Sequence, residues 1–193
     1  MVGFGEYLLK ILLPLYSFAI DVISTELQVE SISLASNGST KQILAVVTNP
    51  SPLHVSSSVL PAGIPIQLST LQGHSLQHFI VIYSILLAYI CGIDKKKYKL
   101  LLTSIPFYLA VEFIDIPLVL LGSGYDLIYS NLAPDLISGS IQIMAMDFLN
   151  GGGRIALSIF AAVCSIGTYK FISNGHYNYL LLLLFSNAKQ IKI

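Results

Sequence analysis

The sequence predicts an all-α membrane protein with four transmembrane helices, a small extracytoplasmic β-hairpin and loop region after the first helix, and an interfacial helix before the fourth. Two observations on composition predict this class. Of the 193 residues, 54% are hydrophobic and 10% are charged, whereas charged residues make up about 25% of a soluble domain. The third observation is that the apolar residues gather in four long runs. The lipid bilayer is therefore the first partner that we expect.

The first element is an apolar run over residues 7–23 that is interrupted by Lys10. At about 17 residues, it is close to the shortest helix that crosses a bilayer. Residues 17–19 (SFA) have the small-x-small pattern of a signal-peptidase site, but no basic side chain precedes Lys10. We therefore expect residues 1–24 to be a retained transmembrane helix.

Residues 25–75 are poorer in large apolar side chains and rich in Ser, Thr, Asn, Gly and Pro. Two aliphatic stretches, residues 27–34 and 42–48, flank Asn37-Gly38, and this arrangement predicts a β-hairpin. Four prolines between residues 50 and 65 exclude a helix there and favour a loop or short edge strands. So small a segment buries little core of its own, so we expect it to pack on the membrane helices or on another protein.

The remaining part, residues 76–193, contains the second and third predicted spans at residues 76–93 and 100–121. The short loop 94–99 between these spans carries four lysines, Lys95, Lys96, Lys97 and Lys99. Because short cytoplasmic loops hold the excess of basic residues, the loop is expected in the cytoplasm and residues 25–75 outside it. The prediction is a multi-pass protein of the plasma (inner) membrane with both termini in the cytoplasm.

The outer segment 122–153 contains apolar residues at helical spacing, which predict a short helix lying in the outer interface. They are Leu136, Ile137, Ile141, Met144 and Phe148. The fourth predicted span covers residues 155–172, and the last apolar piece, residues 179–185, is too short to cross. Gly151, Gly152 and Gly153 lack the Lys-Ser/Thr of a phosphate-binding loop, and predict a hinge between the interfacial helix and the fourth span.

Two carboxylates lie inside the third predicted span, Glu112 and Asp115, three residues apart and so on one helix face. An ionised carboxylate near the middle of a bilayer costs about 2.5–3.5 kcal/mol, so such a residue requires a partner. Arg154 is the only arginine of the chain and opens the fourth span. We expect Arg154 to pair with Glu112 or Asp115 of the same chain, and a contact with another protein inside the bilayer is the alternative. Asp147 is a further candidate for a polar contact with a partner.

His74 and His78, in "HSLQH", lie four residues apart at the outer start of the second span. This spacing places two imidazoles on one side of a helix and suits a metal ion. The HExxH glutamate is missing, and a third ligand would have to come from Asp115, Asp147 or His54. The simpler interpretation is that both histidines mark the membrane interface. We therefore predict no cofactor, and keep the histidine pair as the candidate metal ligands.

Four short pieces, taken in order, carry a resemblance to a known family. They are "LQVESI", "IPIQLSTLQGHSL", "VEFIDIP" and "FLNGGGRIAL". The chain resembles the small membrane proteins associated with exosortases, in particular exosortase H, and departs from them in having no tryptophan. The resemblance implies a companion of a polytopic, transpeptidase-like enzyme that processes C-terminally tagged surface proteins in bacteria. It implies that this chain is the companion and not the enzyme.

Three functions remain after these observations. The first is a non-enzymatic accessory or assembly subunit of a membrane complex, with other integral membrane proteins as partners. The second is a metal-binding membrane enzyme or metal-handling protein that uses His74 and His78. The third is a small transporter that uses Glu112 and Asp115. A nucleic-acid partner is excluded because the net charge is zero and the ten basic residues form no extended patch.

Overall fold

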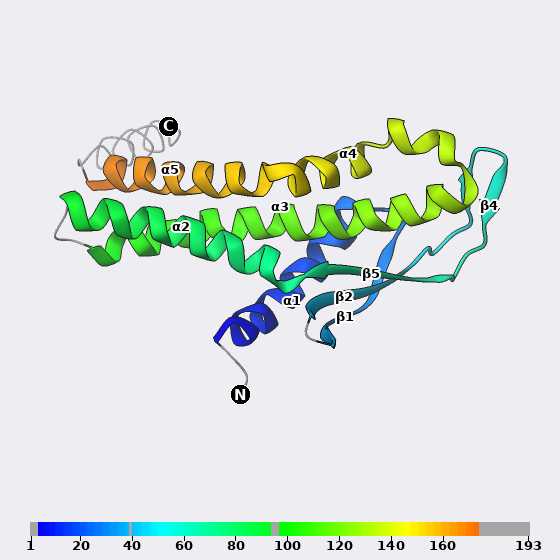
Figure 1. The fold of residues 1–193 in the computed structure, drawn as a ribbon, viewed down its shortest axis with the longest axis horizontal. Coiled ribbons are helices and arrows are strands. Elements are labelled where there is room, and N and C mark those ends of the chain that lie inside the picture. Colours follow the sequence, from blue (N-terminus) through cyan, green and yellow to red (C-terminus); the bar gives the residue numbers. More distant parts are fainter. Residues whose placement is uncertain (1–3, 39, 94–96, 174–193) are drawn as a thin grey trace, which may run out of the picture.

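Three long helices lie side by side and a small sheet covers one end of them (Figure 1). The computed structural model describes residues 4–38, 40–93 and 97–173. The long helices are α2 (Gln72–Ile93), α3 (Lys97–Leu132) and α5 (Arg154–Ser173), and a fourth helix, α1 (Phe4–Ile23), crosses them obliquely. In the described part of the chain, three helical segments are long and apolar enough to cross a membrane: residues 72–92, 99–132 and 141–173.

The prediction of four transmembrane helices is wrong, because α1 is not one of these three segments. Within 20 residues α1 carries Glu6, Lys10 and Asp21. Its charges also have local partners. Lys41 of the sheet donates a hydrogen bond to Glu6, and the Val29 amide donates to Asp21 Oδ1 at 3.0 Å. These contacts hold α1 against the sheet, while α1 also crosses α3 obliquely.

The prediction of an all-α fold is also wrong, because residues 28–71 include a three-stranded antiparallel sheet in the order β1-β2-β5. β1 (Gln28–Asn37) and β2 (Thr40–Thr48) form a hairpin at Gly38, whose φ of +60° suits glycine. β5 (Pro65–Leu71) adds to the other side of β2. The proline-rich segment between them forms two three-residue strands, β3 (Leu53–Val55) and β4 (Ser58–Leu60).

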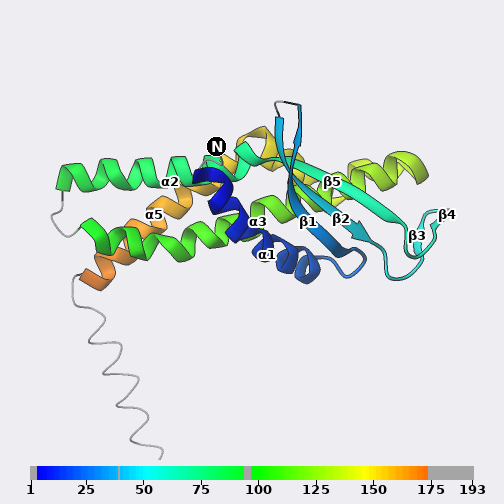
Figure 2. The ribbon, with the colours of Figure 1, turned by 90° about the horizontal axis from the view of Figure 1, so that it is seen from below.

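The sheet buries one face, because buried and exposed residues alternate along β2 and β5. The inward residues of β2 and β5 are Ile43, Ala45, Val47, Ile66 and Leu68, each at most 6% exposed. Figure 2 shows these strands beside the second half of α3. Gly124 allows this approach, since a Cβ there would lie 3.1 Å from Leu68 Cδ2. The segment therefore uses α3 to complete its core.

α3 does not end at residue 121 but continues to Leu132. Its 36 residues span about 54 Å, against about 30 Å for the hydrocarbon core of a bilayer. The sheet packs on the C-terminal third of this helix. After η1 (Pro134–Gly139), the chain returns along α3 through α4 (Ile141–Phe148).

The separate interfacial helix predicted before the fourth span is not present as such. α4 continues through a π-helical turn, η2 (Leu149–Gly153), into α5, so that residues 141–173 make one candidate span. The predicted hinge glycines do mark a kink, because Gly152 has a φ of +118° inside this turn. At Gly153 a Cβ would lie 2.7 Å from the Phe148 carbonyl oxygen, so the turn closes too tightly for a side chain.

Two lysines, Lys99 and Lys170, lie at the end of the long helices opposite the sheet. α3 begins at Lys97, Lys99 is exposed in its first turn, and Lys170 Nζ of α5 lies 5.7 Å from the centre of the Tyr89 ring of α2. Lys95, Lys96 and the tail segment 179–185 lie outside the described residues. The described chain thus has a basic end and a sheet end.

Gly122 provides a test of how tightly α4 packs on α3. A Cβ at this position would lie 2.5 Å from Met146 Cβ and 2.7 Å from the Gln142 carbonyl oxygen. Because backbone must move, Gly122→Ala should lower the free energy of unfolding by about 1–3 kcal/mol. The measurement is thermal unfolding of the purified protein in a mild detergent.

Gly167→Ala is the matched control, because Gly167 also lies inside a long helix but a Cβ there meets nothing within 4 Å. This variant should be unchanged or more stable by about 0.5–1 kcal/mol, since alanine favours a helix over glycine. Equal stability of the two variants would contradict the close contact of α4 with α3.

Candidate functional site

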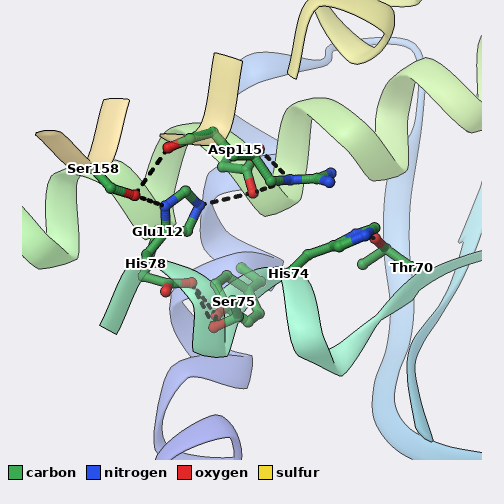
Figure 3. Close-up of polar contacts among 9 residues, drawn as sticks. Thr70, His74, Ser75, His78, Glu112, Asp115 and Ser158 are labelled. Atoms are coloured by element: carbon green, nitrogen blue, oxygen red, sulfur yellow. Dashed lines mark hydrogen bonds and ion pairs between the residues drawn. The ribbon is translucent and has the colours of Figure 1, made fainter. Parts of the chain in front are cut away.

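Two pairs of polar side chains face each other between α2 and α3, as Figure 3 shows. Ser75 and His78 lie one turn apart on α2, and Glu112 and Asp115 lie one turn apart on α3. All four residues are fully buried. His78 contacts Asp115, and Ser75 contacts Glu112. We call these residues, together with Tyr16, Arg154 and Ser158, the buried polar network.

Asp115 is the centre of the network. Its Oδ2 lies 2.9 Å from His78 Nε2. Arg154 Nε donates to both carboxylate oxygens, at 3.1 Å to Oδ1 and 2.9 Å to Oδ2. Arg154 is itself only 4% exposed. Of Glu112 and Asp115, it is therefore Asp115 that forms the ion pair with Arg154. Together with His78, this pair joins α2, α3 and α5.

Glu112 joins α1 to the same network. Its Oε2 accepts a hydrogen bond of 2.5 Å from the Tyr16 hydroxyl and one of 2.8 Å from Ser75 Oγ. Tyr16 is fully buried. Burial and the neighbouring Glu112 carboxylate raise the pKa of the Tyr16 phenol, so that it keeps the proton that it donates. The oblique helix α1 is thus fixed to α3 by a buried hydrogen bond.

Ser158 completes a Ser-His-Asp chain of contacts that has the composition of a catalytic triad. Ser158 Oγ lies 2.8 Å from His78 Nδ1, on the opposite side of the ring from Asp115. The same hydroxyl also donates to the Arg154 carbonyl oxygen at 2.9 Å. Ser158, His78 and Asp115 are all fully buried, whereas a nucleophile must reach its substrate. The geometry favours a structural role over nucleophilic catalysis.

The histidine pair of the sequence does not form a metal centre. His78 uses both ring nitrogens within the network. His74 Nδ1 lies 3.1 Å from Thr70 Oγ1 of β5. Over residues 4–38, 40–93 and 97–173, no three His, Cys, Asp or Glu side chains come together as a candidate metal site. His74 and His78 thus lie on one helix face, but their rings contact different side chains.

The other predicted contact residue, Asp147, is exposed on α4 and lies outside the network. Three network residues could not be found from the sequence: Tyr16, Ser75 and Ser158. Tyrosine and serine are frequent in apolar helices, and neither carries a spacing pattern that would single it out. The one available signal was indirect, because each buried carboxylate must find hydrogen-bond donors somewhere in the fold.

Two buried polar atoms of the network and one of Tyr108 keep unused hydrogen-bonding capacity. Tyr108 Oη, Glu112 Oε1 and Arg154 Nη2 are buried and have no hydrogen-bond partner among the described residues. A buried polar atom without a partner costs about 1–3 kcal/mol, so such atoms are rare in folded proteins. They mark places where water or a ligand has a reason to bind.

Comparison of the chain with protein-family models, with curated proteins and with solved structures gave no match. The interpretation of the buried polar network therefore depends on its own geometry. That geometry is a set of short hydrogen bonds among buried groups, which connects α1, α2, α3 and α5.

Asp115→Asn tests whether the network holds these helices together. The change removes the negative charge that compensates Arg154 and leaves the guanidinium buried without it. We expect the free energy of unfolding to fall by about 3–5 kcal/mol, measured by denaturation in detergent micelles. The exposed Asp147 is the matched control, and Asp147→Asn should change stability by less than about 0.5 kcal/mol.

A double variant distinguishes the contribution of the ion pair to stability from that of side-chain packing. Asp115→Leu with Arg154→Met removes both charges and keeps apolar volume, so it should recover part of the stability that Asp115→Asn loses. If Asp115→Asn were as stable as Asp147→Asn, the ion pair would not be the connection that the geometry indicates.

Proposed function

We propose that this protein is a non-enzymatic accessory or assembly subunit of a membrane protein complex. The observation that carries the proposal is an apolar stripe on the free side of α1. Tyr7, Ile11, Phe18 and Val22 lie on one helix face and are 59%, 75%, 62% and 56% exposed. The opposite face of the same helix, which includes Leu9, Leu12 and Ile20, is buried. A helix that is apolar on both sides requires a second apolar partner.

The position of α1 supports a partner within or next to the membrane. The Tyr16 contact places α1 beside Glu112, which lies about 22 Å along α3 from its first residue. Phe18 packs on Phe113 with ring centres 6.2 Å apart. If the lysine-rich end of the long helices lies in the cytoplasm, α1 occupies the outer half of the bilayer. Its stripe then faces sideways, where helices of another membrane protein would lie.

The burial of the polar network supports a role without catalysis. His78 and Arg154 both contact Asp115, and the three triad-like residues are fully buried. The resemblance to exosortase-associated proteins points to a class of partner, a polytopic enzyme that processes surface proteins. We include that enzyme class in the proposal as the first partner to test.

Photo-crosslinking from α1 tests the proposal. A photoreactive phenylalanine analogue at Phe18 should form an adduct with a second membrane protein in native membranes. Phe160 of α5 is the matched control, since it is another aromatic residue with a similar exposure, 67% against 62%, and we expect it to face lipid. Phe18→Ser should weaken recovery of the partner about tenfold, equivalent to about 1.4 kcal/mol.

A result in which both positions react with lipid alone, and in which the purified protein is a solitary monomer, would contradict the proposal. A partner adduct from Phe160 with none from Phe18 would move the interface to α5. Either outcome would remove α1 as the contact surface.

The proposed orientation follows from three spans instead of four. An odd number of spans puts α1 and the end of α5 on opposite sides, so both cannot be cytoplasmic as the sequence predicted. We propose the plasma (inner) membrane, with the lysine-rich end and the end of α5 in the cytoplasm and the sheet outside.

Two serine-to-cysteine variants in a cysteine-free background test this orientation. Ser57, between β3 and β4, and Ser173, at the end of α5, are both exposed. A membrane-impermeant maleimide should label Ser57→Cys in intact cells and Ser173→Cys only after permeabilisation. The opposite pattern would reverse the orientation, and labelling of both in intact cells would contradict three spans.

A further inference from the structure

A cavity of about 230 Å³ lies between α1, the β1-β2 hairpin and the start of α2. Figure 1 shows α1 and the hairpin beside the start of α2. The charged side chains that line this cavity are Lys10 and Glu6 of α1 and Lys41 of β2. Ser36 of β1 adds a hydroxyl group, and Gln72 of α2 adds an amide. The cavity is therefore lined by polar side chains from four elements, and none of them belongs to the buried polar network.

The charges of this cavity do not cancel. Lys41 donates a hydrogen bond to Glu6, so these two charges compensate each other. Lys10 is exposed, and the ion pairs of the described residues do not include it. Its ammonium group carries three hydrogen-bond donors. One positive charge thus remains available to a ligand in the cavity.

Two neutral groups provide further donors. Gln72 is 5% exposed, and its amide nitrogen donates to the Gln42 carbonyl oxygen at 3.3 Å. Because an amide nitrogen carries two hydrogens, Gln72 keeps a second donor. The hydroxyl group of Ser36, an exposed residue, can rotate to donate as well. The cavity therefore combines one ammonium group with a hydroxyl and an amide.

The cavity lies at one end of a candidate span. Gln72 is the first residue of the span over residues 72–92. These 21 residues rise about 31 Å, which matches a hydrocarbon core of about 30 Å. The start of α1 is at the same level, since a Cβ at Gly5 would lie 3.0 Å from Leu76 Cδ1 of α2. In either orientation of the protein, the cavity is thus at the level of lipid headgroups.

A cavity with an excess positive charge at this level favours an anion. The phosphate of a headgroup accepts hydrogen bonds from ammonium, hydroxyl and amide groups. We propose that this cavity binds a phosphate group, with Lys10 as the charged donor and Ser36 and Gln72 as neutral donors. An anionic lipid and a free phosphate ester share this chemistry. A zwitterionic headgroup fits less well, because its own cation adds to the positive charge.

Native mass spectrometry of the full-length protein, released from a maltoside detergent, tests this inference. The lipid probes are phosphatidylglycerol and phosphatidylcholine, and glycerol 3-phosphate serves as a soluble competitor. Phosphatidylglycerol should bind at least about tenfold more tightly than phosphatidylcholine, the effect of one charged hydrogen bond. Displacement by glycerol 3-phosphate would identify a free phosphate ester as the ligand. A lipid adduct that resists this competitor would identify the lipid headgroup.

Two variants on the same helix should act in opposite directions. Lys10→Gln should weaken one step of phosphatidylglycerol binding about tenfold, because it removes the charged donor. Glu6→Gln should strengthen the same step about fivefold, because it removes the one carboxylate that lines the cavity. Lys99→Gln is the matched control, since it makes the same charge change at an exposed lysine outside the cavity, and it should leave this step unchanged. Thermal unfolding of each variant checks that it is folded.

Absence of saturable phosphatidylglycerol binding would overturn the inference, as would equal affinity for the two lipids. A folded Lys10→Gln variant with every binding step unchanged would also overturn it. If Glu6→Gln weakened binding as Lys10→Gln does, the two residues would have a structural role only. The assay uses the isolated protein, so its outcome is independent of whether a partner covers α1.

Discussion

Asp115 places a carboxylate with no solvent exposure between α2 and α5. Arg154 compensates its charge and His78 contacts it, each at a distance of 2.9 Å. A buried charge of this kind is tolerated only when its partners hold their positions. Those positions fix the rotation of α2 and α5 about their axes. They also fix where α5 begins, and hence where the chain must kink at Gly152 to bring Arg154 to α3. The register of three long helices therefore follows from one carboxylate.

Glu112 extends the same principle to the part of the chain outside the three spans. The Tyr16 hydroxyl reaches it from α1, so an oblique helix with few charges is held at one height on α3. The sheet is then attached from two sides, by α1 at its β1 edge and by the outer part of α3 at its buried face. This arrangement explains why a small β segment needs no core of its own. It also leaves the outer face of α1 apolar and uncovered, which is the basis of the proposed partner contact.

The candidate site could be predicted from the sequence in part. Glu112, Asp115 and Arg154 stand out because ionised groups in apolar segments are costly and need partners. His78 was noticed for its spacing from His74, which suggested a metal, whereas its contacts are Asp115 and Ser158. The hydroxyl donors came from α1, α2 and α5, and no local pattern marks a tyrosine or serine as the partner of a distant carboxylate. A cavity lined by Gln42, Thr70, His74, Ser123, Met146 and Asn150 has walls from six elements, so it exists only once they are assembled.

By itself the sequence determined that the chain contains helices able to cross a membrane, because length and apolar composition set this locally. It also determined the hairpin turn at Gly38 and the break at Gly152, since both depend on backbone freedom at a single glycine. Only the tertiary structure decided that residues 4–23 lie across the bundle instead of spanning, that α3 runs on to Leu132, and that α4 continues into α5. Apolar side chains pack equally well against lipid, a sheet or a helix. Their pattern in the sequence therefore cannot predict which of these neighbours a helix has. The choice depends on contacts between residues far apart in the chain, such as Tyr16 with Glu112 and Asp115 with Arg154.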